Sequence, residues 1–412
     1  MEVVYRCCAG LDVHARTVVA CLNKNGHKEI RTFSTMTDDL LSLSDWLVQE
    51  GCTIVAMEST GVYWKPVFNL LEGVLEVMLV NAQHVKAVPG RKTDVKDCEW
   101  LADLLRHGLL KASFIPPLLI RELRELTRYR QTLIKEQVNI ANRIQRLLES
   151  ANIKLGQVAS DVLGVSGRLM LKQLAEGETD VEKLADLAKG RLKEKRLELR
   201  RALHGRLTVA QRFVLREFLS RVEELDAAIK RVNEEIEREV RASENPFVGE
   251  AIELLQSIPG VGERVAQVIV SEIGVEMDRF PTDRHLSSWA GMSPGNNQSG
   301  GKRKNAKTTK GNVHLRRALV QAAWAATHTK GTYLAAQYRR LVKHKGKQRA
   351  LVAVGHSILV IIYHVLAKRT SYQELGGEYF DKQNVESQRK VYIRKLESLG
   401  LKVSVEELPM AA

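Results

Sequence analysis

The segment Tyr5-Arg-Cys-Cys-Ala-Gly-Leu-Asp12-Val decides the fold of the first part of the chain, because it is an apolar run that carries an aspartate. We predict that it forms a β-strand. A second predicted strand, Cys52-Thr-Ile-Val-Ala-Met57, places Glu58 at its carboxyl end. A predicted helix carries Asp94 and Asp97, which share one helix face because of their i, i+3 spacing. These elements together offer four carboxylates.

The order of the surrounding elements indicates the fold class. Three apolar segments, joined by short polar connections, come first: 5–12, 18–22 and 29–33. Asn23-Lys-Asn-Gly26 is a strong hairpin turn between two of them. Helical and extended segments then alternate: a helix at 37–49, a strand at 52–57, a helix from 61, a strand at 76–80 and the acid-bearing helix. This α/β order is that of a ribonuclease H-like domain with Asp12 on the central strand.

The four carboxylates are candidates for a magnesium site. Mg²⁺ prefers oxygen ligands and commonly takes a few carboxylates, with substrate phosphate supplying the rest. Four carboxylates meeting at one point could hold two ions roughly 4 Å apart, as in nucleases and polymerases. Taken singly, each acid is more simply interpreted as a turn, cap or solvated residue. The order of the elements is what favours a shared site.

Composition indicates the class of partner. The chain has 412 residues, enough for two or three domains, and a net charge of +14. Such a surface should attract polyanions, and neutralisation of phosphate by Lys and Arg dominates nucleic-acid affinity. No run of residues approaches the 18 or more apolar positions of a membrane span, and the N-terminus has no secretory pattern. We therefore expect a cytoplasmic protein with no membrane partner.

Cysteine usage agrees with that compartment. Five cysteines all lie in the first part of the chain, an odd number without the spacing of a metal finger: Cys7, Cys8, Cys21, Cys52 and Cys98. Most fall in predicted strands. We interpret them as reduced core residues and predict no structural zinc.

The middle of the chain is predicted to be helical, with two heptad seams. The first comprises Leu119, Leu123, Leu126, Arg130, Leu133, Gln137, Ile140, Ile144 and Leu147, and the second Leu215, Leu219, Val222, Leu225, Ile229, Val232, Ile236 and Val240. The polar positions Arg130 and Gln137 are candidates to fix the register. The seams fit an intramolecular helical hairpin or a coiled coil that dimerises the protein, and the second alternative is slightly favoured. A charged, largely helical stretch at 189–201 lies between them.

The last third of the chain holds a second chemical signal. Ile258-Pro-Gly260-Val-Gly262 has the form of a helix-hairpin-helix, whose backbone N–H groups can hold a phosphate, although such turns also occur purely for packing. Residues 295–301 are mostly Gly, Asn and Ser, which predicts an exposed loop. The basic residues expected to contact phosphate follow it: Lys302, Arg303, Lys304, Lys307, Lys310, Arg316 and Arg317.

Ser299 is a candidate nucleophile in that loop. It stands between Gln298 and two glycines, beside Lys and Arg side chains that would stabilise its alkoxide and the charge of an attacked phosphate. Serine and glycine are also ordinary turn formers, and no activating partner adjoins Ser299 in sequence.

Several motifs, taken in order, are shared with a known family. In the first part they are Gly10-Leu-Asp12-Val-His14, Met57-Glu58-Ser-Thr-Gly61, Val85-Lys86 and Gly90-Arg-Lys92-Thr-Asp94-Val-Lys-Asp97-Cys-Glu-Trp-Leu-Ala102. In the last third they are Ile258-Pro-Gly-Val-Gly262, Gly291-Met-Ser-Pro294, Ser299-Gly300 and Gly311-Asn312-Val-His-Leu-Arg316. Across nearly its whole length the chain resembles the DEDD transposases of the insertion-sequence-110 family. It departs from the family's usual alanine at Cys98.

The resemblance implies an organisation and a mechanism. It implies a RuvC-like domain (1–115), a helical coiled-coil linker (116–246), a mainly helical transposase domain with the helix-hairpin-helix and serine loop (247–375), and a tail (376–412). Asp12, Glu58, Asp94 and Asp97 would bind Mg²⁺, and Ser299 would be the recombination nucleophile. The partners implied are double-stranded donor and target DNA, a structured noncoding bridge RNA, and further copies of the chain, as dimers that assemble into a tetramer.

Two rival functions remain open at this point. A plain Mg²⁺-dependent RuvC-like junction nuclease would need the carboxylates but not Ser299. A non-catalytic nucleic-acid-binding scaffold would use the helix-hairpin-helix and the basic loop, with the carboxylates only structural.

Overall fold

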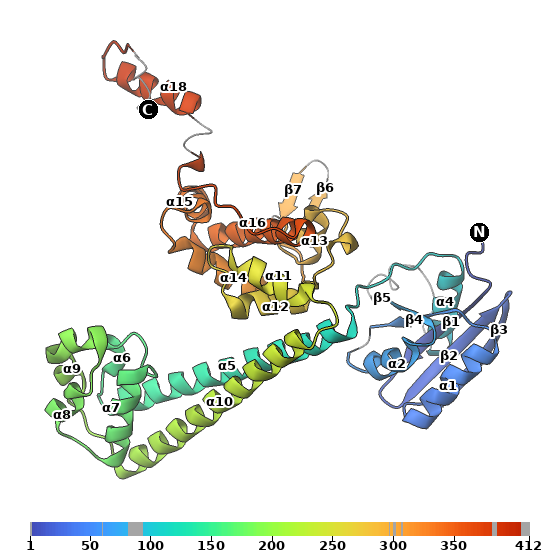
Figure 1. Ribbon diagram of the computed structural model, residues 1–412, viewed down its shortest axis with the longest axis horizontal. Helices are drawn as coiled ribbons and strands as arrows, with labels where there is room; N and C mark the ends of the chain where they lie inside the picture. The colour runs from blue at the N-terminus through green and yellow to red at the C-terminus, as the bar shows by residue number, and fades with distance from the viewer. Residues whose placement is uncertain are drawn as a thin grey trace. The chain divides into compact units, whose positions relative to one another are not determined.

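The computed structural model describes residues 2–59, 61–80, 94–295, 297–299, 302–305, 308–380 and 385–404. The side chains of 94–96, 297–299, 302–305 and 385–388 lie outside that description. The chain forms two compact units, Met1–Pro116 and Pro117–Ala412 (Figure 1). The finer division into four segments stays a prediction.

The N-terminal unit is built on a mixed five-stranded sheet. Its strands are β1 (Cys7–Val13), β2 (Thr17–Lys24), β3 (His27–Ser34), β4 (Ile54–Glu58) and β5 (Glu76–Val80), in the order β3-β2-β1-β4-β5. The first three pair antiparallel, and β4 and β5 add in parallel beside β1. Asn25 and Gly26 both have positive φ, 55° and 98°, as a tight Asn-Gly hairpin requires. The predicted order of strands is confirmed, and β1 is central.

Helices cover both faces of this sheet (Figure 1). On one face, Ala9, Leu11 and Val13 pack in a single apolar cluster with side chains of α1 (Thr37–Gln49) and α2 (Trp64–Leu71). On the other face lies α4 (Asp94–Arg106), whose Leu105 packs with Cys8, Ile54 and Ala56. The two faces follow from the period-two alternation of side chains along β1.

Gly10 brings α4 directly against the main chain of β1. A β-carbon at this position would stand 2.3 Å from the carbonyl oxygen of Cys98 and 2.6 Å from the amide nitrogen of Ala102. Because Cys98 and Ala102 lie over Gly10 while Leu105 lies beside Cys8, α4 runs opposite to β1. The first turn of α4 is therefore at the end of β1 where Asp12 stands.

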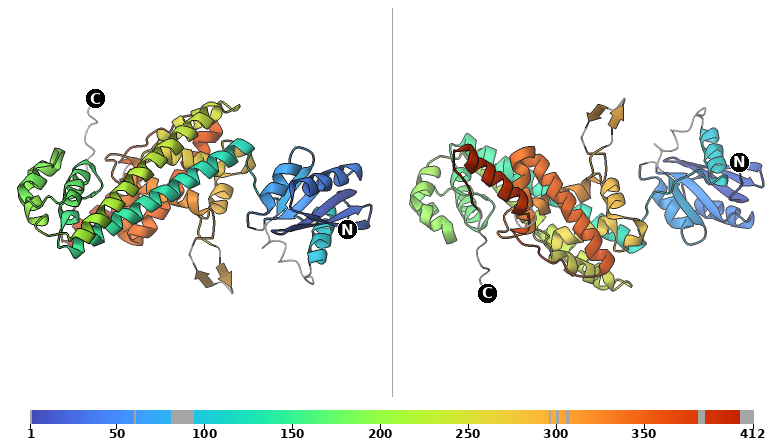
Figure 2. Two further views of the ribbon diagram at one scale, coloured as in Figure 1. Left: turned by 90° about the horizontal axis from the view of Figure 1, so that it is seen from below. Right: turned by 90° about the horizontal axis from the view of Figure 1, so that it is seen from above.

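The C-terminal unit contains a long two-helix arm. Helix α5 (Leu118–Ser150) and helix α10 (Val209–Arg241) lie side by side, as Figure 1 and the left view of Figure 2 show. Hydrogen bonds join Arg130 to Asn233 (3.0 Å) and Gln137 to Asp226 (2.6 Å), so the helices are antiparallel. A helical cap closes the far end, formed by α6 (Leu155–Val158), α7 (Val165–Glu176), α8 (Val181–Asp186), η1 (Gly190–Lys195) and α9 (Arg196–Ala202).

The two heptad seams pair within one chain. Buried residues of both belong to one apolar cluster, including Leu133, Ile140 and Ile144 of α5 and Leu219, Val222 and Leu225 of α10. Arg130 and Gln137 make their polar contacts across this seam, as the sequence pattern predicted. The structure therefore supports the intramolecular hairpin, and the slight preference for dimerisation through these seams is corrected. A repeating apolar seam is satisfied equally by a helix of the same chain.

The rest of the unit is largely helical, and several of its helices pack against α16. Its elements are α11 (Phe247–Gln256), α12 (Glu263–Ile273), η2 (Met277–Arg279), α13 (Asp283–Trp289), β6 (Asn297–Ser299), β7 (Lys302–Asn305), α14 (Val313–Thr327), α15 (Tyr333–Lys345), α16 (Lys347–Lys368) and α18 (Val385–Ser398). The sequence predicted no membrane-spanning segment, whereas α16 is long and apolar enough to cross a membrane by length and composition alone. It packs instead against α11, α13, α14 and α15, with Val354, Ile358 and Ile362 fully buried, as a core helix does.

The predicted helix-hairpin-helix is formed by α11 and α12, and its two glycines differ. Gly260 has a φ of +88°, and a β-carbon there would stand 2.2 Å from the carbonyl oxygen of Ala322 and 2.6 Å from the amide nitrogen of Ala326, both on α14. Gly262 has nothing within 4 Å and begins α12 with an ordinary φ of −89°. Gly260 thus has a packing role, and only the turn at Gly262 faces open space.

This difference predicts unequal effects of two alanine substitutions. Gly260→Ala should lower the free energy of unfolding by about 2 kcal/mol or more, since it combines overpacking with a left-handed backbone. Gly262→Ala should lower it by no more than about 1 kcal/mol, because its β-carbon would meet nothing and only the preference for glycine over alanine at the N-cap of α12 is lost. Urea denaturation of both variants measures this, and equal losses would contradict the packing role of Gly260.

We predict that the stability of the arm does not depend on assembly of the protein. Leu225→Ala empties a buried seam position and should cost about 3 kcal/mol, whereas Lys230→Ala on the exposed side should cost little. Because α5 and α10 pair within one chain, the loss in thermal midpoint should be constant across a roughly hundredfold range of protein concentration. A midpoint that rises with concentration would instead indicate that the seam joins two chains.

Candidate functional site

Two of the four predicted carboxylates stand next to each other on the sheet. The parallel pairing of β1 and β4 sets Leu11 opposite Met57, so that Asp12 and Glu58 are the next residues of the two neighbouring strands. Neighbouring strands lie about 4.8 Å apart. By alternation, both residues belong to the sheet face that α4 covers, the face of Cys8 and Ala56. The register alone therefore brings Asp12 beside Glu58.

The other two carboxylates are on the first turns of α4. Asp94 is the first residue of this helix, and its side chain is among those not described. Asp97 is half-buried and precedes Cys98, which is buried over Gly10. Because α4 runs opposite to β1, these turns lie toward the Asp12 end of the strand. The structure thus brings Asp97 and the backbone of Asp94 to the end of the sheet that carries Asp12 and Glu58.

His14 and a pair of thiols complete the surroundings of Asp12. Nε2 of His14 lies 3.2 Å from Oδ2 of Asp12, whose side chain is 13% exposed. Cys21 and Cys98 are fully buried in one small cluster, and a hydrogen bond between their thiols raises the pKa of Cys21 and lowers that of Cys98. The sequence motif contained His14, but neither its contact with Asp12 nor the thiol pair was predicted.

Asp103, which lies farther along the same helix, is engaged elsewhere. Its Oδ2 pairs with Nζ of Lys28 at 2.6 Å, and its Oδ1 accepts a hydrogen bond from Nδ2 of Asn23 at 3.2 Å. Both partners are on the β2–β3 hairpin side of the unit. Asp97 is therefore the better placed of the two aspartates for a site with Asp12.

The donor set fits a hard divalent cation, but a closed metal cage is not seen. Carboxylate oxygens are the ligands that Mg²⁺ prefers, and two of them are neighbours in register. Among the side chains that the structure describes, no three His, Cys, Asp or Glu groups gather closely enough to hold an ion. That search does not include the side chain of Asp94.

In the C-terminal unit, Ser299 belongs to a β-hairpin, where the sequence predicted an exposed loop without strands. Ser299 is the last residue of β6, and its backbone pairs with Lys302, the first residue of β7 (Figure 1). Its side chain is not described. The sequence did not indicate strands here because Gly, Asn and Lys have low strand propensity.

The base of this hairpin is held by close main-chain contact. Gly291 and Gly311, which flank the hairpin, pack backbone to backbone, and a β-carbon on Gly311 would stand 2.3 Å from the amide nitrogen of Gly291. Gly291 has a φ of +67°. A bridge between Pro294 and Thr308 continues the pairing toward the hairpin. The two ends of the segment are thus fixed side by side.

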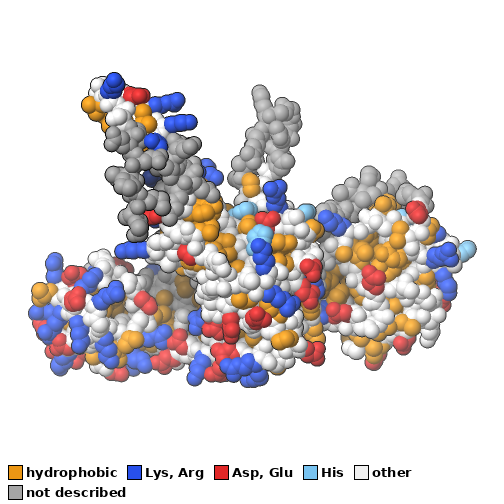
Figure 3. All heavy atoms as spheres, turned by 45° about the horizontal axis from the view of Figure 1, so that its top comes forward, with side chains coloured by type: hydrophobic (Ala, Val, Ile, Leu, Met, Phe, Trp, Pro, Cys, Tyr) orange, Lys and Arg blue, Asp and Glu red, His pale blue; other side chains and the backbone are white. Residues whose placement is uncertain are grey.

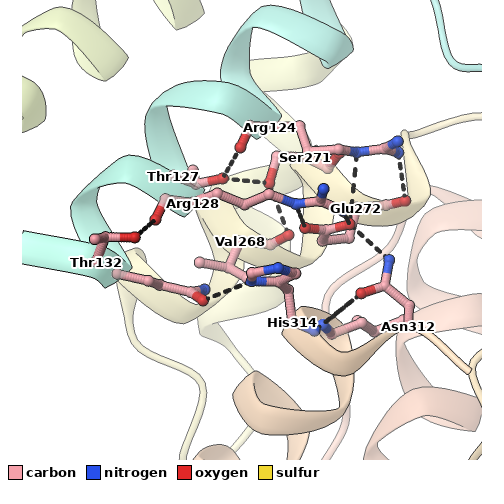
Figure 4. Close-up of polar contacts among 11 residues, drawn as sticks. Arg124, Thr127, Arg128, Thr132, Val268, Ser271, Glu272, Asn312 and His314 are labelled. Atoms are coloured by element: carbon pink, nitrogen blue, oxygen red, sulfur yellow. Dashed lines mark hydrogen bonds and ion pairs between the residues drawn. The ribbon is translucent and has the colours of Figure 1, made fainter. Parts of the chain in front are cut away.

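A buried polar network adjoins this base, and sequence reasoning missed it. Glu272 on α12 is fully buried and accepts hydrogen bonds at 2.8 Å from Nε and Nη2 of Arg128 and at 2.6 Å from Nδ2 of Asn312 (Figure 4). Burial acts to raise the pKa of Glu272, but Arg128 and Asn312 hold this pKa below its ordinary value of 4.5. The ionised carboxylate of Glu272 therefore contributes fully to stability above about pH 4.5, and this contribution is lost as the pH falls below that value.

The predicted phosphate-contacting residues surround the hairpin and its base. Lys302, Arg303 and Lys304 belong to β7, and Lys307 lies outside the described residues. Lys310 and Arg317 are exposed, and Arg316 is half-buried on the first turn of α14. Figure 3 shows Lys and Arg side chains spread over the visible surface and interspersed with Asp and Glu. Charge alone therefore does not single out one interface.

Two family models match this chain in the regions just described. A DEDD transposase model of the IS110 family, described as "Transposase", matches residues 9–153. A second, described as "Transposase IS116/IS110/IS902 family", matches residues 252–339. The first covers the sheet, α4 and α5, and the second covers the helix-hairpin-helix, the hairpin of Ser299 and α14.

Similar proteins carry related descriptions. A "Probable family 20 transposase" of Pseudomonas aeruginosa is 23% identical over 327 residues, which cover 78% of this chain and 86% of that protein. The "Insertion element IS110 uncharacterized 43.6 kDa protein" of Streptomyces coelicolor is 29% identical over 121 residues, 29% of this chain and 30% of that protein. A "Pilin gene-inverting protein" of Moraxella bovis is 28% identical over 134 residues, 31% of this chain and 41% of that protein. The chain belongs to the IS110 family of transposases and is a DNA transposase or recombinase.

The surroundings of the two aspartates predict different results for their alanine variants. Asp97→Ala should abolish DNA strand exchange and leave the protein folded, since the loss of one acid relieves repulsion within the cluster. Asp103→Ala should keep strand exchange and lose up to about 1 kcal/mol of stability, because the half-exposed pair with Lys28 is screened by solvent. Strand exchange on a labelled DNA substrate, with thermal melting alongside, checks both. Activity in Asp97→Ala together with inactivity in Asp103→Ala would reverse the assignment.

Proposed function

We propose that this protein is the transposase of a bacterial insertion sequence, a cytoplasmic enzyme that cuts and rejoins DNA with Mg²⁺ and a serine nucleophile. Asp12, Glu58, Asp94 and Asp97 are the proposed metal ligands, and Ser299 is the proposed nucleophile. The observation that carries the proposal is the register of β1 and β4, which makes Asp12 and Glu58 neighbours at the end of the sheet reached by the first turn of α4.

The sheet supports a ribonuclease H-like (RuvC-like) assignment for the N-terminal unit. Its order β3-β2-β1-β4-β5, with an antiparallel meander followed by two parallel strands, is the order that this fold class uses. The central strand carries the first acid. Acids on the central strand, on its parallel neighbour and on α4 then belong to the same end of the sheet.

The proposed reaction exchanges one ester bond for another. The Oγ of Ser299 forms a bond to the phosphorus of a DNA phosphodiester, and one bond between that phosphorus and a deoxyribose oxygen breaks. The serine proton ends on the departing deoxyribose hydroxyl, so no cosubstrate is consumed. Attack on the phosphoserine by a hydroxyl from another strand reverses these changes and joins the new pair. The energy of the phosphodiester bond is therefore kept throughout.

The carboxylates and the hairpin of Ser299 have complementary tasks in this proposed reaction. Mg²⁺ bound by the carboxylates would lower the pKa of an oxygen and neutralise charge on the attacked phosphate. The hairpin of β6 and β7 presents Ser299 in a segment rich in cations, which stabilise the additional charge on the phosphate. Ser299 has no His or Lys next to it in sequence, which favours activation through space.

The proposed partners are donor and target DNA, a structured noncoding bridge RNA and further copies of the chain, as dimers that assemble into a tetramer. The net charge of +14 and the cations around the hairpin support a polyanionic partner. Because the heptad seams pair within one chain, assembly would use other surfaces. The relative named for pilin gene inversion also favours site-specific inversion as a second outcome of the same chemistry.

Trapping the covalent intermediate tests this proposal. On a nicked suicide DNA substrate with Mg²⁺, we expect a nucleotide adduct on the peptide that contains Ser299, detected by digestion and mass spectrometry. Ser299→Ala should lose the adduct and strand exchange, whereas the nearby Ser293→Ala should keep both. Normal recombination by Ser299→Ala would favour the junction nuclease instead, and strand binding without any Mg²⁺-dependent cleavage would favour the scaffold.

A further inference from the structure

The segment that follows the Ser299 hairpin leads into Asn312, a residue whose side chain makes hydrogen bonds with both its oxygen and its nitrogen. Asn312 follows Gly311 and is the N-cap of α14. Its Oδ1 accepts hydrogen bonds from the backbone nitrogens of His314 (3.0 Å) and Leu315 (3.1 Å), and its Nδ2 donates to Glu272 at 2.6 Å. Because both the oxygen and the nitrogen of the amide are hydrogen-bonded, the orientation of the Asn312 side chain is fixed.

Glu272 connects Asn312 to helix α5 of the arm. Its two carboxylate oxygens receive the two parallel hydrogen bonds of Arg128, each 2.8 Å long. Such a bidentate pair fixes an angle as well as a distance. Arg128 is on α5, so one carboxylate joins the end of α12, the start of α14 and the long helix (Figure 4).

The end of α12 is held to α5 through its main chain as well. Nε of Arg124 donates to the carbonyl oxygen of Ser271 at 2.9 Å, and its Nη2 donates to the carbonyl oxygen of Glu272 at 2.8 Å. The hydroxyl oxygens of Thr127 and Ser271 lie 2.9 Å apart. These contacts bind carbonyls that a helix end leaves without partners. Glu272 therefore has little freedom to move relative to α5.

Stability alone does not account for this arrangement. Replacement of a buried ion pair by well-packed apolar side chains is often neutral or stabilising. Directed hydrogen bonds add one defined geometry. Here they fix the side chain of Asn312, which stands between the serine hairpin and α14. Helix α5 also begins directly after Pro117, the first residue of the C-terminal unit, and Pro116 is the last residue of the N-terminal unit. The base of the hairpin is thus fixed to the helix that leads to the acid-bearing unit.

We propose that Glu272, Arg128 and Asn312 are positioning residues for strand cleavage. They form a clamp that fixes the base of the Ser299 hairpin against α5 and so sets the approach of the serine oxygen to the phosphodiester. This inference rests on the proposed role of Ser299. Because a displacement of about 1 Å in a reacting group can cost a factor of about 100 in rate, loosening of the clamp acts on the chemical step and not on DNA binding.

Two variants loosen the clamp in different ways. Glu272→Gln removes the charge that Arg128 binds and keeps the size of the side chain. Asn312→Ser keeps a good N-cap for α14 but removes the donor to Glu272, which makes it the milder change. In full-length protein with Mg²⁺ and suicide DNA, both should slow formation of the Ser299 adduct at saturating DNA by about 10- to 100-fold. The DNA concentration for half-maximal rate should stay within about twofold of wild type.

Arg130→Lys is the matched control. Arg130 is a buried arginine of α5 that, like the partly exposed Arg128, reaches α12. Its hydrogen bonds go to Asn233, Gln267 and the carbonyl oxygen of Arg264. This variant should lose a similar amount of thermal stability and keep the wild-type rate of adduct formation. The double variant E272Q/N312D restores an amide-to-carboxylate hydrogen bond in the reverse direction and should recover at least part of the rate.

The outcomes separate this inference from the proposed function. A normal adduct rate in both clamp variants, or an equal loss of rate in Arg130→Lys, would overturn the positioning role and leave the serine chemistry standing. Absence of a Ser299 adduct in the wild-type protein would overturn the serine chemistry and the clamp with it. A loss of rate confined to the clamp variants, at unchanged DNA half-saturation and with recovery in the double variant, is the result expected.

Discussion

The contact between α4 and β1 at Gly10 is the constraint on which the acid-bearing end of the sheet depends. The backbone of Cys98 and Ala102 occupies the space that a β-carbon of residue 10 would need. Contact at this distance fixes the height of the helix above the sheet, and with it the height of Asp94 and Asp97 relative to Asp12. The parallel pairing of β1 with β4 then fixes the position of Glu58 beside Asp12. Two main-chain contacts, one to a helix and one to a strand, therefore converge on one end of the sheet.

Local patterns predicted the N-terminal unit well because its elements are determined by neighbours in sequence. The alternation along β1, the positive-φ turn at Asn25 and Gly26, and the acids at strand and helix ends could all be identified without knowledge of distant partners. The heptad seams of the arm were also visible. Their partner was not, because the same apolar repeat serves a helix of the same chain or of another one.

The missed features depend on contacts that no local pattern contains. Glu272 follows a run of apolar residues at the end of α12, and its partner Arg128 is 144 positions away in the sequence. Before the two meet, each resembles an ordinary solvated charge. The hairpin at Ser299 was missed for a different reason, since residues of low strand propensity are paired there by the fixed base at Gly291 and Gly311. Tertiary structure, and not propensity, makes those strands.

Helix α5 is shared between two parts of the C-terminal unit, and this has a consequence for cooperativity. One apolar cluster runs from Ile120 through the arm and the cap to Leu366 of α16. The arm cannot open without exposing part of the core that supports the hairpin of Ser299. Many proteins confine partial unfolding to a peripheral segment. Here, partial unfolding of the arm would extend to the helices that support the hairpin of Ser299. The arm and those helices should therefore melt in a single transition.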